Sequence, residues 1–267
     1  MLNLFNLIVF IFGLAVGSFL NCIIYRLEVA KSFLEGRSYC PYCKHILGWQ
    51  DLIPIFSFLI LRGKCRYCQK PISWQYPLVE LATAILFILV INNQLLIINF
   101  QNLLSTFYFL LSICFLIIIF VYDLKHYIIP DKIIYFAILI AFLYNVLYSY
   151  FIPHTSYFIL NTTSAAFGAA AFFLAIVLVS KGSWMGVGDV KLAFFMGLFL
   201  GFPKILVALF LSFLIGAAIG LGLVTVGKKT LKSEVPFAPF LVTGTFLAMF
   251  WGKELINWYF NFFNGII

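Results

Sequence analysis

Long apolar segments alternate with short polar ones along almost the whole chain. Runs of roughly 17 to 22 residues, the length that an α-helix needs to cross the hydrocarbon core of a bilayer, can be placed at about eight positions. The sequence therefore predicts an all-α polytopic membrane protein of about eight transmembrane helices, near 4–24, 76–92, 103–122, 133–152, 158–179, 190–203, 204–226 and 237–260. The sixth run is short and glycine-containing, so we expect its border with the seventh to be the hardest to place.

The polar segments give the orientation of these helices. The chain is 64% hydrophobic and 10% charged, which excludes an ordinary soluble domain. The opening helix has no basic residue before it and no small-residue cleavage site, so we expect it to be retained rather than removed as a signal peptide. If the N-terminus lies outside, the loops 25–75, 123–132, 180–191 and 227–236 are cytosolic and hold 15 of the 17 Lys and Arg residues. This is the asymmetry that the positive-inside rule requires.

The longest polar segment, 25–75, contains two Cys-x-x-Cys pairs. Two such pairs can supply the four thiolates of a tetrahedral metal site, so the segment predicts a small zinc-ribbon-like loop with a structural zinc ion. The ligands would be Cys40, Cys43, Cys65 and Cys68. Basic residues surround the pairs, but membrane orientation explains them better than nucleic acid does. We therefore expect no nucleic-acid partner, and a division into a first helix (1–24), a four-cysteine loop (25–75) and a membrane core (76–267).

Two carboxylates stand out in the core. Asp123 follows the apolar run that ends at Tyr122, and Asp189 follows Gly186 and Gly188 in a polar stretch between two other apolar runs. Ionisable residues at such positions are candidates for function, and both acids fall at the cytosolic edge of the membrane. Glycines allow unusual backbone conformations and let another chain approach closely, as a site that reads an extended peptide needs. We interpret Asp123 and Asp189 as a catalytic pair. The alternative for Asp189 is a helix N-cap after a glycine turn, and that for Asp123 is an interfacial charge paired with Lys125.

Several blocks of sequence, in this order, resemble the bacterial type IV prepilin peptidases. They are Gly13-Leu14-Ala15-Val16-Gly17-Ser18-Phe19-Leu20-Asn21, the four-cysteine loop, Trp49-Gln50-Asp51-Leu52-Ile53-Pro54, Tyr76-Pro77-Leu78-Val79-Glu80, Tyr122-Asp123-Leu124-Lys125, Ile129-Pro130-Asp131, Gly186-Val187-Gly188-Asp189 and Pro236-Phe237-Ala238-Pro239-Phe240. The family more often has glycine where this chain has Ala238.

The resemblance implies a membrane aspartic peptidase of the glycine-x-glycine-aspartate type, with Asp123 and Asp189 as its catalytic pair. Such enzymes cut the basic leader from prepilins and pseudopilins on the cytosolic side of the bacterial inner membrane. Many also methylate the new amino terminus with S-adenosylmethionine, and the four-cysteine loop is associated with the members that do both. The expected partners are therefore prepilin and pseudopilin substrates and the lipid of the membrane.

Peptide hydrolysis by two carboxyl groups needs one ionised and one protonated. Proximity provides this, because ionising the second carboxyl is opposed by the charge of the first. The basic leader of a substrate needs acidic partners, and four acids could supply them: Glu28, Glu35, Asp51 and Glu80. We expect Asp131 to cap the next helix. We expect Lys125 and Lys191 to set the orientation of the helices in the membrane or to favour the ionised form of the nearby carboxylate.

Two other functions fit part of the sequence. A proton-coupled transporter would use the two acids but leaves the four-cysteine loop unexplained. A membrane-tethered zinc module that binds a partner would explain the cysteines but not the acid pair. Loss of either acid should abolish peptidase activity, whereas the zinc module should tolerate it.

Overall fold

The computed structural model is mostly helical over the residues that it describes, which are 2–29, 36–94, 100–151, 156–227 and 235–264. Within these ranges there is no β-strand, and two isolated β-bridges are the extended pairings. The chain divides into two compact units, Met1–Ile118 and Ile119–Ile267. Helix α4 passes from the first unit into the second. The prediction of an all-α membrane protein is confirmed.

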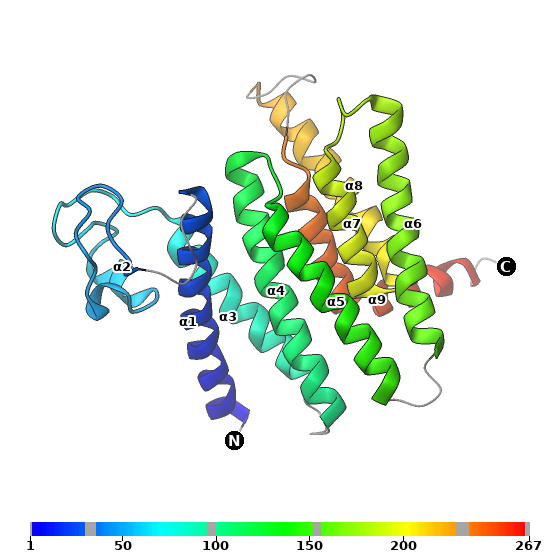
Figure 1. Cartoon of the computed structure of the whole chain (residues 1–267), viewed down its shortest axis with the longest axis horizontal. Coiled ribbons are helices and arrows are strands. Elements are labelled where there is room, and N and C mark those ends of the chain that lie inside the picture. Colours follow the sequence, from blue (N-terminus) through cyan, green and yellow to red (C-terminus); the bar gives the residue numbers. More distant parts are fainter. Residues whose placement is uncertain (1, 30–35, 95–99, 152–155, 228–234, 265–267) are drawn as a thin grey trace. The chain divides into compact units, whose positions relative to one another are not determined.

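Each of the eight apolar runs forms a helix (Figure 1). Six are long and apolar enough to cross a bilayer, whereas α7 and α9 do not meet both criteria within the described residues, so the number of spans stays a prediction. A 3-10 helix, η1 (Trp49–Asp51), and a short helix, α2 (Phe56–Ile60), lie in the loop between the first two long helices. The long helices are α1 (Leu2–Glu28), α3 (Gln75–Gln94), α4 (Phe100–His126), α5 (Asp131–Phe151), α6 (Ser156–Ser180), α7 (Val187–Leu200), α8 (Lys204–Thr225) and α9 (Ala238–Asn264).

In the first unit, α1 and α3 pack closely through small residues. A Cβ atom on Gly13 would lie 2.5 Å from the Cα of Ala84, and one on Gly17 would lie 2.6 Å from the Cα of Glu80. Any side chain at either glycine would push the helices apart, as in other membrane helix pairs that meet at small residues. The side-chain amide of Asn21 donates to the backbone carbonyl of Tyr76 at 3.0 Å, which fixes the register near the end of α1.

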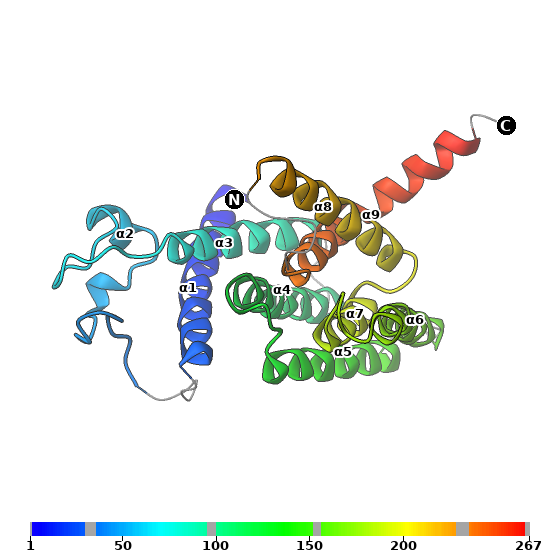
Figure 2. The same ribbon diagram turned by 90° about the horizontal axis from the view of Figure 1, so that it is seen from above.

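In the second unit, α7 is the central helix and packs against α5, α6, α8 and α9 (Figure 2). Its contact with α6 is tight, because a Cβ atom on Gly197 would lie 2.3 Å from the Cα of Ala166. The buried amide of Asn145 on α5 donates to the carbonyl of Leu198 at 3.1 Å. With 14 residues, α7 rises only ~21 Å, less than the ~30 Å hydrocarbon core. It is held by its neighbours rather than by lipid.

The loops α4–α5 and α6–α7 lie at the same end of the second unit (Figure 1). Asp123 is in the last turn of α4 and Asp189 is in the first turn of α7. The antiparallel course of these helices therefore places both acids at this end. Lys125, Lys181 and Lys191 belong to the same end.

Candidate active site and metal centre

The four-cysteine loop is built from two segments with the same backbone pattern. In the first, the N–H of Cys40 donates to the carbonyl of His45, and the N–H of Lys44 donates to the carbonyl of Cys40. In the second, 25 residues later, the N–H of Cys65 donates to the carbonyl of Lys70, and the N–H of Gln69 donates to the carbonyl of Cys65. A bridge closes each segment, one between Tyr39 and Ile46 and one between Lys64 and Pro71. Each segment is thus a tight knuckle that presents two thiols on one side.

The four thiols converge. The sulfur atoms of Cys40, Cys43, Cys65 and Cys68 all lie within 4.8 Å of one another, and those of Cys40 and Cys68 are 3.8 Å apart. Ligands at ~2.3 Å from a tetrahedral zinc ion stand ~3.8 Å apart, so the spacing suits zinc. The donors and their geometry fit a structural zinc ion, with no open position left for a substrate. The other two cysteines, Cys22 and Cys114, lie in α1 and α4 and outside this cluster.

Asp51 joins η1 to the second knuckle. Its carboxylate accepts hydrogen bonds from the guanidinium of Arg66 at 2.8 Å, from the hydroxyl of Tyr67 at 3.2 Å and from the N–H of Gly48 at 3.2 Å. Burial raises the pKa of this carboxyl, but the three hydrogen bonds outweigh burial, so its pKa lies below the ordinary value for aspartate. The Trp49-Gln50-Asp51 block is therefore part of the support of the metal site.

The structure brings Asp123 and Asp189 together within the second unit. The carboxyl groups are close enough for the charge of Asp123 to act on Asp189. The side chain of Asp123 is buried, with a residue exposure of 5%, and that of Asp189 is half-buried. Within the part of the chain that the structure describes, Oδ2 of Asp123 has no hydrogen-bond partner. This carboxyl oxygen is thus buried without a polar partner, as a group kept for chemistry rather than for structure can be.

The two glycines beside Asp189 act differently from the expectation. Neither has a positive φ, so the idea that they supply unusual backbone conformations is wrong. Gly186 is the N-cap of α7, with φ −85° and ψ 160°, and a Cβ atom there would meet nothing nearer than 3.8 Å. Gly188 allows a close approach, because its Cβ would lie 3.2 Å from the Cβ of Ile129 in the α4–α5 loop. This contact brings the start of α7 against the segment that follows Asp123.

Backbone groups complete the surroundings of the acids. The N–H of Ala238, the first residue of α9, interacts with the carboxyl of Asp123, and the N–H of Gly186 interacts with that of Asp189. Ala238 is fully buried. Sequence reasoning noticed this block only through the family resemblance and gave it no role. Backbone donors have no sequence signature, so only the fold reveals Ala238 as a neighbour of the acid pair.

Comparison with known sequences decides the family. Residues 11–93 match the sequence model of the bacterial peptidase A24 N-terminal domain, and residues 110–221 match that of the type IV leader peptidase family. A prepilin leader peptidase/N-methyltransferase of Bacillus subtilis (strain 168) is 35% identical over 254 residues, which cover 94% of this chain and 96% of that protein. The chain belongs to the type IV leader peptidase family.

Other members of the family are nearly as similar. The proteins of the same name from Aeromonas hydrophila and Legionella pneumophila are each 32% identical over 283 residues. These alignments cover 94% and 96% of this chain, and 92% and 94% of the relatives. No solved structure matches the chain. The resemblance seen in the sequence blocks is confirmed over almost the full length of this family member.

Lys191, two residues after Asp189, forms an ion pair with Asp131. The ammonium of Lys191 donates to Oδ1 of Asp131 at 2.6 Å and lies 4.7 Å from the centre of the Tyr135 ring. Lys191 therefore ties the start of α7 to the start of α5. Asp131, the first residue of α5, thus pairs with a lysine, a contact that the capping role expected for it does not include.

The acids expected to meet a basic leader have local partners where the structure describes them. Asp51 is held by Arg66, and Glu80 is buried with its Oε2 accepting from the N–H of Ile55 at 2.7 Å. Glu28 ends α1 and has partners of its own. Glu35 lies outside the described residues. Neither Asp51 nor Glu80 is thus poised for an incoming peptide.

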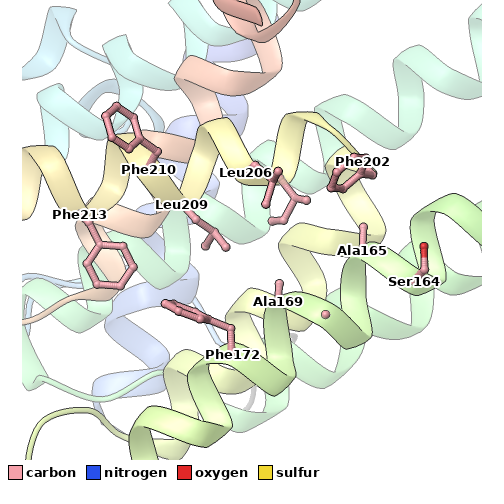
Figure 3. A pocket seen from close by; sticks show the side chains of 11 residues that line it. Ser164, Ala165, Ala169, Phe172, Phe202, Leu206, Leu209, Phe210 and Phe213 are labelled. Atoms are coloured by element: carbon pink, nitrogen blue, oxygen red, sulfur yellow. The ribbon is translucent and has the colours of Figure 1, made fainter.

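An apolar cavity of about 470 Å³ lies between α6 and α8 in the second unit (Figure 3). Small residues of α6, including Ala165, Gly168 and Ala169, form one wall, and bulky residues of α8 such as Leu206 and Phe210 form the other. Neither catalytic candidate lines it. A cavity without charged side chains suits hydrocarbon and cannot pair with the basic leader of a substrate.

Proposed function

We propose that this chain is a membrane aspartic endopeptidase that removes the basic leader from type IV prepilins and pseudopilins and then N-methylates the new amino terminus. The observation that supports it best is the meeting of Asp123 and Asp189, two acids 66 positions apart in sequence, at one end of the second unit. The relatives named prepilin leader peptidase/N-methyltransferase, which align over nearly the whole chain, point to the same substrates and to both reactions.

In the proposed reaction the two carboxyl groups share one proton. The ionised carboxylate takes a proton from water, and the resulting hydroxide attacks the carbonyl carbon of the scissile peptide bond. The protonated carboxyl donates its proton to the carbonyl oxygen, which relieves the negative charge that develops there. When the C–N bond breaks, the leaving nitrogen receives a proton from the acid pair. Backbone N–H groups of Ala238 and Gly186 hold the two carboxyls in place for these transfers.

We place this site at the cytosolic face of the bacterial inner membrane. Lys125, Lys181 and Lys191 share the end of the second unit that bears the acids, and positive residues accumulate on the cytosolic side. A prepilin keeps its apolar helix in the bilayer, so the junction between leader and helix meets the acids near the interface. Water reaches them there without crossing the hydrocarbon core.

The four-cysteine loop supports the second activity. Cys40, Cys43, Cys65 and Cys68 would hold zinc, which supplies a fixed fold to a loop that has few other buried residues. S-adenosylmethionine would supply the methyl group for the new α-amine. We assign the loop (25–75) to this reaction and the core (76–267) to peptide cleavage.

Mass spectrometry of a prepilin incubated with the purified protein and S-adenosylmethionine tests both activities. We expect loss of the leader and gain of one methyl group with the wild type. Asp123→Asn and Asp189→Asn should show neither, because asparagine keeps the shape and cannot transfer the proton. Asp131→Asn, a third acid at the same end, is the matched control and should process the substrate.

The outcomes separate the assignments. Full processing by either asparagine variant would contradict the catalytic pair. Cleavage without methylation would retain the peptidase and remove the transferase. No cleavage of several prepilins by a folded wild type would return attention to proton-coupled transport.

A further inference from the structure

The short helix α2 turns its apolar face outward. Phe56, Leu59 and Ile60 are 60%, 61% and 73% exposed, and their spacing of three and four residues puts them on one side of the helix. The inner side is fixed by other contacts. The hydroxyl of Ser57 donates to the carbonyl of Gln50 at 2.7 Å, and the ring of Phe58 lies 4.9 Å from that of Trp74. A soluble loop would present the opposite pattern, with the apolar side inward.

A buried hydrogen bond sets the level of α2 along the membrane helices. The N–H of Ile55, the residue before α2, donates to Oε2 of Glu80 at 2.7 Å. Glu80 is the sixth residue of α3, so it lies ~7.5 Å along the axis from the start of that helix. The apolar span of α3 begins at Gln75 and is 19 residues long, about the thickness of the hydrocarbon core. The side chain of Glu80 leans toward the start of α3, so the start of α2 is level with the first turns of the span, at the boundary between headgroups and hydrocarbon.

Glu80 itself is held rigidly, which makes this level well defined. The residue is 6% exposed, and Gly17 of α1 packs directly on its Cα. Ile55 has φ 60°, a conformation rarely adopted by β-branched residues. The hydrogen bond to Glu80 compensates for this backbone conformation. This hydrogen bond therefore fixes the start of α2 against α3.

The rest of the loop has the composition of a membrane-surface segment. Trp49 and Trp74 are 74% and 69% exposed, and tryptophan is enriched at the level of lipid headgroups. Residues 36–74 hold six basic residues and one acidic residue, so the loop stays positive even after the two negative charges of a zinc tetrathiolate centre. Anionic headgroups attract such a surface.

We propose that α2 is an interfacial helix whose face of Phe56, Leu59 and Ile60 inserts into the headgroup and acyl boundary of the anionic bilayer, held at that depth by Glu80. The two knuckles are then held in a fixed orientation relative to the membrane. The partner is lipid and not a protein, because the helix is tied to a membrane span at the depth of the lipid and a basic surface adjoins it. This inference does not depend on the proposed reactions.

Fluorescence quenching of the full-length protein tests the insertion. An environment-sensitive fluorescent amino acid replaces Ile60 in one variant and Tyr42, a 60% exposed residue of the first knuckle, in the matched control. The protein is reconstituted in vesicles of phosphatidylethanolamine and phosphatidylglycerol whose acyl chains are brominated near the headgroup. We expect several-fold stronger quenching of the Ile60 probe than of the Tyr42 probe by brominated lipid, and the reverse with aqueous iodide.

Two results would overturn the proposal. One is access of iodide to the Ile60 probe equal to that at Tyr42, which would place α2 in water. The other is weak quenching of the Ile60 probe by brominated lipid. This includes quenching no stronger than at Tyr42, and it is the result expected if protein covers the face.

A second pair of variants tests the role of Glu80. Glu80→Ala removes the acceptor for the N–H of Ile55, so quenching of the Ile60 probe by brominated lipid should fall several-fold. Glu80→Gln keeps an acceptor oxygen and should retain the quenching. Zinc content, measured by atomic absorption, should be unchanged in Glu80→Gln and shows whether the loop remains folded. Equal quenching in the alanine and glutamine variants would contradict the anchoring role.

Discussion

A side chain at Gly188 should slow the reaction without unfolding the protein. The Cβ of alanine at this position would lie 3.2 Å from the Cβ of Ile129, whereas ordinary contacts begin near 3.4 Å. The start of α7 must therefore move by a few tenths of an ångström relative to the segment that follows Asp123. Alanine also stabilises a helix by ~1 kcal/mol relative to glycine, which offsets the strain. We expect a folded enzyme with a displaced acid pair.

The size of the effect follows from the geometry. A misplacement of ~1 Å at reacting groups costs about a hundredfold in rate, so a shift of a few tenths of an ångström should cost roughly two- to sixfold, or ~0.5–1 kcal/mol of transition-state free energy. Gly188→Val, with two further carbon atoms facing Ile129, should lose more. Leader cleavage measured by mass spectrometry over time, beside thermal unfolding of the same samples, separates rate from stability.

Gly186 provides the matched control. A Cβ atom there meets nothing nearer than 3.8 Å, so Gly186→Ala should cleave at close to the wild-type rate. Alanine is a poorer N-cap than glycine, so this variant should instead lose a few tenths of a kcal/mol in stability. The two variants thus have opposite signatures. Wild-type rates for Gly188→Val, or equal losses of activity in the two alanine variants, would refute the positioning role of the Gly188 contact.

Three further predictions concern the metal, an ion pair and a helix contact. Replacing any one of the four loop cysteines with serine should abolish bound zinc in elemental analysis, whereas Cys114→Ser should keep it, because only the former belongs to the thiol cluster. Lys191→Met should cost at most ~1 kcal/mol in unfolding experiments, and nothing more when combined with Asp131→Asn, since the pair is partly exposed. Gly197→Leu should prevent folding in membranes because it separates α6 from α7, while Gly168→Leu, where a Cβ meets no atom within 4 Å, should fold; expression and detergent gel filtration check both.

The helices and the cluster of four thiols could be predicted because each depends on a pattern along the chain. A bilayer requires a minimum apolar length, so the eight runs appear directly, and even the border between α7 and α8 falls within three residues of its expected place. The Cys-x-x-Cys pairs form knuckles whatever surrounds them. Neither result depends on knowing which helices touch.

The parts that sequence reasoning missed depend on contacts between distant segments. Lys191 was considered together with Asp189, two residues away, yet its partner is Asp131, sixty residues away. Glu80 was a candidate for binding a leader, but it accepts a hydrogen bond from Ile55. The role of Ala238 comes from its backbone, which any residue type could supply. Such partners are decided by the packing of helices and have no local pattern.

The matched knuckles imply all-or-none behaviour of the four-cysteine loop. Each knuckle offers two sulfur atoms, and a tetrahedral centre needs four, so neither knuckle keeps the ion alone. A bound ion would also close a loop between segments 25 residues apart, and that closure would disappear with the ion. Oxidation of a single thiol should therefore release both halves together, and a cell short of zinc would contain loops that are either complete or open, with no half-assembled form between them.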